Sequence, residues 1–265
     1  MTRRRLDAEL VRRRLARSRE HASQLIADGR VRVGGQPATK PATQVEAGAA
    51  IVVAEAAGGP EYVSRGGHKL AGALAAFPEL AVAGRRCLDA GASTGGFTDV
   101  LLRAGAAHVY AVDVGYGQIA WSLRTDERVT VMERVNIRDL TPDRLGEPPD
   151  LVVGDLSFIS LTLVLDPVRR CAAPDADYAM MVKPQFEVGR ERVGAGGVVR
   201  DPELRAEAVR HVAAHAGTLG LGVLGVAASP LPGPSGNVEY FLWLRAGAPP
   251  LDEEALAKAV AEGPQ

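Results

Sequence analysis

Seven short apolar segments, separated by stretches long enough to form helices, constrain the fold of this chain more than any other feature. We expect these segments to be strands at residues 86–89, 109–113, 129–133, 151–155, 178–183, 221–227 and 238–244. Between and around them, helices are predicted at residues 67–76, 96–104, 159–170, 202–219 and 251–262. Strands that alternate with helices build a doubly wound sheet, because each parallel return needs a crossover. The predicted fold class is therefore α/β, with a seven-stranded, mainly parallel sheet.

A smaller segment with a different pattern precedes the sheet. An apolar stripe predicts a helix at residues 6–15, and Ser18 is a suitable N-cap for a second helix that Gly29 ends. Short strands are predicted at residues 31–33 and 51–53, on either side of a Gly-Gly turn. We therefore predict a small N-terminal α+β domain at residues 1–58, a linker at residues 59–64 and a second domain at residues 65–265.

Charge is distributed unevenly between these two domains. The whole chain has a formal net charge of -1, but residues 1–60 hold 11 Lys and Arg against 6 Asp and Glu. A run of like charge can be no more than a solvated helix face. However, the arginines at positions 12, 13, 14, 17 and 19 repel one another, and a polyanion such as nucleic acid would relieve that repulsion.

Composition excludes several classes of protein. Charged residues make up 24% and hydrophobic residues 46% of the chain, which is ordinary for a globular protein and argues against disorder. We expect no secretory signal and no membrane segment, because no apolar stretch is long enough. The 2 cysteines predict no disulfide framework and fit a cytoplasmic protein. The 5 histidines are scattered, so we expect no metal site.

A glycine-rich turn follows the first predicted strand of the sheet, in the sequence Asp89-Ala-Gly-Ala-Ser-Thr-Gly-Gly-Phe97. A strand, a glycine turn and a helix N-terminus form the usual setting of a nucleotide site. A dinucleotide fingerprint would place glycine where Ser93 stands, and a side chain there would crowd a pyrophosphate. An adenosine ligand without pyrophosphate, such as S-adenosylmethionine, fits better. Asp113, at the end of the next strand, can accept the ribose hydroxyl protons; a turn without any ligand is the alternative.

Four ionisable residues fall at the ends of predicted elements. Asp155 and Lys183 close two strands, Glu239 opens the last strand, and Lys69 lies in the helix before the sheet. Each alone could be a structural ion-pair partner. A lysine that ends an apolar strand is nevertheless unusual, since desolvation favours the uncharged amine, which can act as a base.

Motifs across almost the whole chain resemble one known family. Residues Leu6-Asp7, residues 16–19 and Lys40-Pro41 look like the RNA-binding fold of ribosomal protein S-four. The glycine turn and the segments at residues 154–161, 182–187 and 230–241 resemble FtsJ-type ribose methyltransferases. The two joined by a short linker resemble the TlyA family, also labelled haemolysin A-like.

This resemblance implies a class I, Rossmann-like fold and S-adenosylmethionine-dependent 2′-O-methylation of cytidine in 16S or 23S ribosomal RNA. Ribosomal subunits would be the partner, and we expect a monomer that contacts neither membrane nor metal. By motif position, the catalytic residues would be Lys69, Asp155, Lys183 and Glu239, with Lys183 as the general base. The predicted cofactor contacts are Asp89, Gly91, Ser93, Thr94, Gly95, Gly96, Phe97, Asp113, Asn136, Asp155 and Phe158. The predicted RNA contacts are Arg5, Arg13, Arg17, Ser18, Arg19, Lys40 and Arg65.

Three other functions stay open at this point. An NAD-dependent oxidoreductase with a basic appendage is disfavoured by Ser93 and by the lack of an evident hydride-transfer acid. A membrane-lytic protein, which the haemolysin label suggests, is disfavoured by the lack of an apolar span. An RNA-binding protein with an inactive second domain is disfavoured because all four catalytic positions are occupied.

Overall fold

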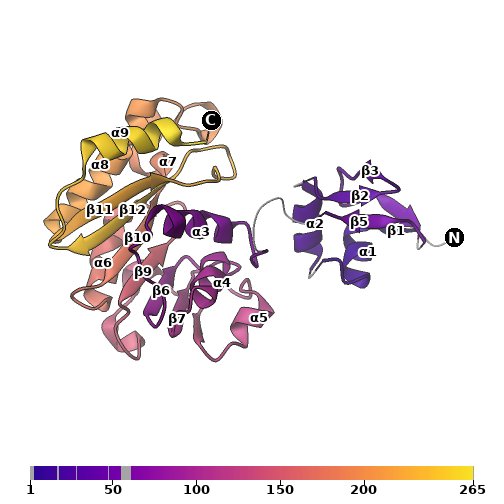
Figure 1. Cartoon of the computed structure of the whole chain (residues 1–265), viewed down its shortest axis with the longest axis horizontal. Helices are drawn as coiled ribbons and strands as arrows, with labels where there is room; N and C mark the ends of the chain where they lie inside the picture. The colour runs from indigo at the N-terminus through magenta and orange to yellow at the C-terminus, as the bar shows by residue number, and fades with distance from the viewer. Residues whose placement is uncertain (1–2, 17, 28, 47, 55–60, 265) are drawn as a thin grey trace. The chain divides into compact units, whose positions relative to one another are not determined.

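The computed structural model describes residues 3–16, 18–27, 29–46, 48–54 and 61–264 (Figure 1). The chain divides into two compact units, Met1–Glu61 and Tyr62–Gln265. The boundary between Glu61 and Tyr62 falls inside the predicted linker. Each unit buries its own hydrophobic residues, so each has a separate core.

Unit 1 combines two helices with short strands. Its elements are β1 (Arg3–Arg5), α1 (Leu6–Arg12), α2 (Arg19–Ala27), β2 (Val31–Val33), β3 (Gln36–Pro37), β4 (Gln44–Glu46) and β5 (Ile51–Val53). Strand β1 pairs with β4, and β2 pairs with both β3 and β5, all antiparallel. Leu6, Leu10, Leu25 and Ile26 are buried between the helices and the strands, as the apolar stripe predicts.

The first helix ends earlier than predicted, at Arg12 rather than residue 15. Arg14 adopts a left-handed backbone conformation with φ of 60°, which a continuing helix cannot contain. The N–H groups of Leu15 and Ala16 then both bond to the carbonyl oxygen of Leu10. Strands β1, β3 and β4 were not predicted, because they are short and mostly polar.

Unit 2 is built on one seven-stranded sheet in the order β11-β12-β10-β9-β6-β7-β8. Strand β12 runs opposite to the other six, since it pairs antiparallel with both β10 and β11 while the remaining pairs are parallel. The strands are β6 (Arg86–Ala90), β7 (His108–Val112), β8 (Val129–Met132), β9 (Leu151–Gly154), β10 (Asp177–Val182), β11 (Leu221–Ala228) and β12 (Tyr240–Ala246). All seven predicted strands are present, and the mainly parallel α/β fold class is confirmed.

Helices cover both faces of this sheet. The longer helices are α3 (Gly66–Ala76), α4 (Gly96–Arg103), α6 (Leu165–Cys171), α8 (Pro202–Thr218) and α9 (Glu253–Glu262). Residues of α6 and α8 share one core cluster, and residues of α3 and α4 share the other. Figure 1 shows α8 and α9 beside β11 and β12. No helix in the part of the chain that is described combines the length and the apolar character needed to cross a bilayer.

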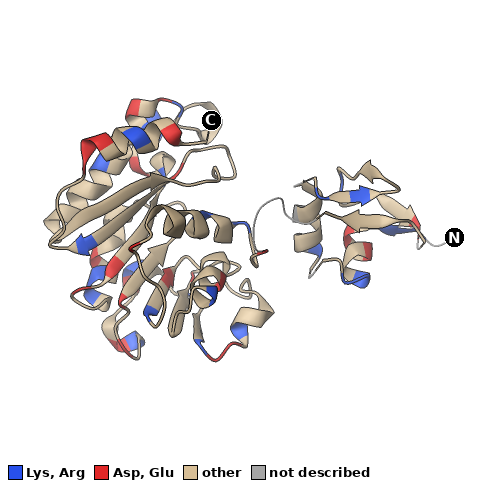
Figure 2. Cartoon of the chain, in the orientation of Figure 1, with Lys and Arg blue, Asp and Glu red and all other residues tan. Residues whose placement is uncertain are grey.

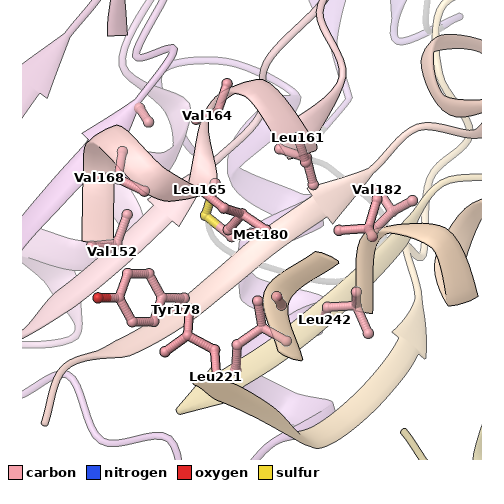
Figure 3. Packing of buried hydrophobic residues seen from close by; sticks show 14 of the residues in the cluster. Val152, Leu161, Val164, Leu165, Val168, Tyr178, Met180, Val182, Leu221 and Leu242 are labelled. Carbon is pink, nitrogen blue, oxygen red and sulfur yellow. The ribbon is translucent and has the colours of Figure 1, made fainter. Parts of the chain in front are cut away.

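Alternating side chains of β10 serve the two cores. Tyr178, Met180 and Val182 point to the cluster that includes Val168 of α6, as Figure 3 shows. Ala179 and Met181 belong to the opposite cluster. A strand buried on both faces is apolar throughout, which explains why it reads as one continuous run in the sequence. Cys87 and Cys171 lie in these cores as free thiols.

Several predicted boundaries in unit 2 differ from those observed, among them those of one helix and of the last strand. The helix predicted at residues 159–170 is instead a 3-10 turn, η3 (Leu161–Leu163), followed by α6. Ser160, directly before η3, is extended, and Phe158 has a φ of 63°, so no helix can begin there. The last strand begins at Tyr240 rather than residue 238. The short helices α5 (Trp121–Arg124) and α7 (Pro184–Glu187) were missed, since four residues carry little periodic signal.

A buried carboxylate, Asp177, fixes the end of the sheet at which the parallel strands begin. Asp177 opens β10 and accepts hydrogen bonds from Trp243 (2.7 Å), Arg245 (2.8 Å) and Arg85 (2.5 Å). Burial alone would raise the pKa of Asp177, but these donors hold it below its usual value. The carboxylate therefore links β10 and β12 to the segment that precedes β6.

Replacing Asp177 with Ala should lower the free energy of unfolding of unit 2 by about 3–5 kcal/mol, because the guanidinium groups and the indole N–H lose their acceptor. Chemical denaturation followed by tryptophan fluorescence measures this loss. Asp175→Ala, at an exposed neighbouring position, is the matched control and should change stability by less than about 0.5 kcal/mol. Equal effects of the two variants would contradict the structural role of Asp177.

Candidate active site

The four predicted catalytic residues lie at one edge of the sheet. Asp155 and Lys183 directly follow the parallel strands β9 and β10, so both stand at carboxyl ends. Glu239 directly precedes β12, and an antiparallel strand begins at the edge where parallel strands end. Lys69 reaches the same edge from the first turn of α3. Sheet topology thus gathers residues that are up to 170 positions apart in the sequence.

The four side chains form a row of alternating charge. Glu239 Oε2 lies 2.5 Å from Lys69 Nζ, and Lys69 Nζ lies 3.9 Å from Asp155 Oδ2. The other oxygen of Asp155, Oδ1, lies 2.6 Å from Lys183 Nζ. Only 4% of Lys69 and 6% of Lys183 is exposed, and Glu239 is fully buried. A protonated amine needs a carboxylate beside it at this depth, because an unpaired charge would be costly.

Ser157 extends the row by one hydroxyl. Lys183 Nζ donates a hydrogen bond to Ser157 Oγ at 2.9 Å. Ser157 was not predicted as a site residue. The only feature of the sequence that indicates Ser157 is its position two residues after Asp155, in the segment that follows the same strand.

Two cavities meet at Lys183. The smaller, about 300 Å³, is lined by the glycine turn, by Lys69 and Asp155, and by residues 64–66. The larger, about 1120 Å³, is lined by Phe158, Phe186, Glu239 and the segment around Asn237. Both cavities share Ser157, Lys183 and Pro234. A molecule in either cavity would therefore lie against the same amine.

The glycine turn crosses the point where the strand order reverses, between β6 and β9. Open α/β sheets bind ligands at such a point. Gly91 has a φ of 87°, and a Cβ there would lie 2.9 Å from the carbonyl oxygen of Asp155. Glycine is needed at this position because of the positive φ and because the turn approaches the backbone of Asp155 too closely for a side chain. The turn then leads into the N-terminus of α4, whose first N–H groups have no partner within the helix.

Asp113 orders the turn from the neighbouring strand. Its Oδ2 accepts the N–H of Ser93 at 2.8 Å, and its Oδ1 accepts the N–H of Gly115 at 2.6 Å. Ser93 has a φ of 48°, so the contact coincides with a left-handed turn. Asp113 therefore stands beside the turn, as predicted from its position after β7, and each oxygen retains capacity for a second donor.

Asp89 is the last residue but one of β6, just before the turn, and is fully buried. Thr98 Oγ1 donates to its Oδ2 at 2.7 Å, but among the described residues its Oδ1 has no partner. Burial raises the pKa of Asp89 to about 7. A buried acceptor without a donor beneath a glycine turn fits a site that receives a polar ligand.

The remaining predicted cofactor contacts divide into two groups. Gly91, Ser93, Thr94, Gly96, Phe97 and Asp155 line the smaller cavity. Asn136 lies apart from it, and its side chain accepts the N–H of Arg138 at 3.1 Å as a helix cap. Phe158 lines the larger cavity and is 91% exposed. Gly95, with a φ of 97°, faces Leu123 and Ile119.

The predicted RNA contacts in unit 1 surround two buried acids. Asp7 accepts hydrogen bonds from Arg5 (2.9 Å) and Arg19 (3.0 Å), and Glu9 accepts them from Arg12 (2.6 Å) and Arg13 (2.7 Å). The guanidinium of Arg5 holds the pKa of Asp7 well below its usual range, and Arg12 and Arg13 lower that of Glu9 to about 2. The acids therefore stay ionised and organise the arginines that Figure 2 marks in blue.

Other predicted RNA contacts differ in their surroundings. Lys40 is exposed, whereas the Ser18 side chain accepts the N–H of His21 at 3.1 Å, as its predicted capping role requires. Arg65 belongs to unit 2, where it lines the smaller cavity and donates to the carbonyl oxygen of Pro232 at 2.5 Å. Arg17 lies outside the described residues.

The strand order, the single antiparallel strand β12 and a glycine turn at the switch point define a class I, Rossmann-like methyltransferase fold. The family model of FtsJ-like methyltransferases matches residues 62–246, and that of the S4 domain matches residues 4–51. The chain belongs to the FtsJ-like methyltransferase family and carries an S4 domain at its N-terminal side.

Relatives match along nearly the whole chain. The 16S/23S rRNA (cytidine-2′-O)-methyltransferase TlyA of Mycobacterium tuberculosis is 61% identical over 98% of each chain. A protein of Brachyspira hyodysenteriae named Hemolysin A is 37% identical over 84% of this chain and 92% of its own. A solved structure from Streptococcus thermophilus, also named as a hemolysin, is 37% identical, with a TM-score of 0.77, and covers 99% of this chain and 97% of its own.

Replacing Asp89 with Asn should change how stability depends on pH. An acid whose pKa is raised on folding stabilises the folded state only while it is protonated, so wild-type stability should fall as pH rises from about 4 to about 7. The neutral amide lacks this titration. Between pH 5 and pH 8, the wild type should lose roughly 2–4 kcal/mol relative to Asp89→Asn. Denaturation curves at both pH values measure this difference, and parallel behaviour of the two proteins would refute it.

Proposed function

We propose that this protein transfers a methyl group from S-adenosylmethionine to the 2′-oxygen of a cytidine ribose in ribosomal RNA. The proposal follows the activity for which the relative that is 61% identical is named. The observation that carries it is the place of the Lys183 amine, which is shared by a cavity beside a glycine turn and a larger cavity with aromatic walls. Transfer between two ligands requires both to reach one point, and proximity is a large part of such catalysis.

The smaller cavity is the proposed cofactor side. When bound, S-adenosylmethionine supplies an electrophilic methyl group on a sulfonium centre. Residues of the glycine turn would hold the cofactor, Asp113 would accept ribose hydroxyl protons, and Asp89 has a buried oxygen to which no described residue donates. The proposed cofactor contacts that do not line this cavity are Asp89, Gly95, Asp113, Asn136 and Phe158.

Lys183 is the proposed general base. A ribose hydroxyl loses its proton as the new C–O bond forms, so a base within hydrogen-bonding reach speeds the transfer. The carboxylate of Asp155 orients the amine from one side and Ser157 orients it from the other. The proton of the hydroxyl would pass to Lys183 Nζ as the oxygen bonds to the methyl carbon, and the bond from that carbon to sulfur would break to leave a neutral thioether.

The rest of the row would hold Lys183 and its partner Asp155 in place for that transfer. Asp155 is shared, because Lys69 stands 3.9 Å from its second oxygen. The positive charge of Lys69 offsets part of the attraction that Asp155 exerts on Lys183 Nζ. Glu239 holds Lys69 in place at 2.5 Å and thereby fixes this balance.

The larger cavity is the proposed nucleotide side. Phe158 presents an exposed ring there, and aromatic rings stack on unpaired bases. Arg138 and Arg190 line the same cavity and can contact phosphates. The target cytidine would have to leave its base stack to enter.

The S4 domain is the proposed site of rRNA capture. Buried acids organise Arg5, Arg13 and Arg19, and Lys40 is exposed, so the donors of these side chains can meet phosphate oxygens. The other proposed RNA contacts are Arg17 and Ser18 in the same domain and Arg65 in unit 2. Phosphate contacts of this kind fix register rather than read sequence.

Replacing Lys183 with Ala should lower methyl transfer to ribosomal RNA by at least about 10²–10³-fold, because the proton of the hydroxyl loses its acceptor. Transfer of a labelled methyl group to purified rRNA measures the rate. Calorimetric titration with S-adenosylmethionine should give an affinity within about threefold of wild type. Turnover near the wild-type rate in this variant would remove Lys183 from the proposed role.

Replacing Lys40 with Ala should reduce the slope of log K against log salt for rRNA binding by about 0.7–0.9, the value for one phosphate contact. Filter binding at several salt concentrations measures the slope. Lys258→Ala, an exposed lysine on α9, is the matched control and should leave the slope unchanged. If both variants give the wild-type slope, Lys40 makes no phosphate contact.

A further inference from the structure

The segment that supplies both partners of Lys183 has little regular structure of its own. Asp155 and Ser157 lie on residues 155–160, between the end of β9 and the start of η3. The segment contains Phe158 in a left-handed conformation with φ of 63°, which costs free energy in a residue other than glycine. Contacts from elsewhere must therefore hold it in place.

Glu187 supplies the polar part of those contacts. Its Oε1 accepts the backbone N–H of Leu161 at 2.8 Å, and its Oε2 accepts the hydroxyl of Ser160 at 2.6 Å. Both hydrogen bonds are made at the N-terminus of η3. Backbone N–H groups there have no carbonyl acceptor within the helix, so Glu187 supplies the acceptor for that of Leu161. Glu187 therefore fixes the end of the segment that is farthest from β9.

Glu187 also belongs to the element that begins directly after Lys183. Helix α7 consists of Pro184–Glu187, so the base and the carboxylate are separated by a single helical turn. Phe186, on the same turn, packs against Phe158 with ring centroids 5.3 Å apart. Three kinds of contact thus join residues 183–187 to residues 155–161: the Lys183 pairs, the ring contact and the Glu187 hydrogen bonds.

The surroundings of Glu187 show that it is not simply a surface charge that faces water. Burial raises its pKa, whereas the bonds from Ser160 and Leu161, together with His211 and His215 of α8, act in the opposite direction. Partial burial of a carboxylate costs free energy of solvation. The two short hydrogen bonds to Glu187 offset that cost. Both of those bonds come from Ser160 and Leu161, which directly follow the residues that carry Asp155 and Ser157.

We infer that Glu187 is a positioning residue for methyl transfer: it holds residues 155–161 so that Asp155 and Ser157 keep the Lys183 amine aimed at the meeting point of the two cavities. This inference rests on the proposed role of Lys183. Glu187 itself touches neither ligand cavity among their lining residues. Its effect should therefore appear in the rate of the chemical step and not in the binding of either ligand.

The test is steady-state methyl transfer to rRNA by Glu187→Ala and Glu187→Gln in the full chain. Glu187→Ala should lower kcat about 10–100-fold, the range expected when a catalytic group is displaced by about 1 Å. Its KM for rRNA and its affinity for S-adenosylmethionine should stay within about threefold of wild type. Glu187→Gln should recover kcat to within about fivefold, because the amide oxygen can accept Leu161 N–H while the amide N–H₂ donates to Ser160.

Glu254→Ala, at an exposed position on α9, serves as the matched control and should match wild type in every constant. An unchanged kcat in Glu187→Ala overturns the inference. So does a parallel loss of cofactor affinity and thermal stability, which would mark a structural role, or a Gln variant as slow as the Ala variant. Lys183→Ala measured alongside separates the two proposals: if it keeps turnover, the base is wrong, and if it alone loses turnover, only Glu187 is wrong.

Discussion

A buried row of two lysines and two acids is the interaction on which the rest of the site depends. Ions leave water at a high cost, which is recovered only when each finds its opposite at short range. The distances of 2.5 Å between Lys69 and Glu239 and of 2.6 Å between Lys183 and Asp155 meet that condition. Removing any one member would take a charged partner away from a neighbouring buried side chain. The sheet and the loops around it must therefore hold four side chains from distant segments in one register.

The sheet topology makes that register possible. Carboxyl ends of parallel strands meet at one edge, and the antiparallel β12 brings Glu239 to the same edge. At the opposite edge, Asp177 ties β10 and β12 together, so the strands that bear Lys183 and Glu239 cannot slide independently. The structural charge cluster and the catalytic row thus act on the same pair of strands.

Much of this arrangement could be predicted from the sequence, because apolar runs such as 178–183 and 151–155 can hardly be other than buried strands. Residues at strand ends, such as Asp155 and Lys183, follow directly from those runs. The contacts of Ser157 and Glu187 could not be predicted, since they depend on an irregular segment with a left-handed Phe158 that propensities do not describe. The organisation of Arg5 and Arg19 by Asp7 was also missed, because charge counting ignores which acids are buried.

The most direct test of the account is the chemical identity of the methylated nucleoside. Ribosomal RNA treated with the protein and labelled S-adenosylmethionine can be digested to nucleosides and analysed by mass spectrometry. A base placed against a ribose hydroxyl predicts 2′-O-methylcytidine, and no product when the target is a 2′-deoxycytidine. A methyl group on the cytosine ring, or modification of the deoxy substrate, would contradict the account.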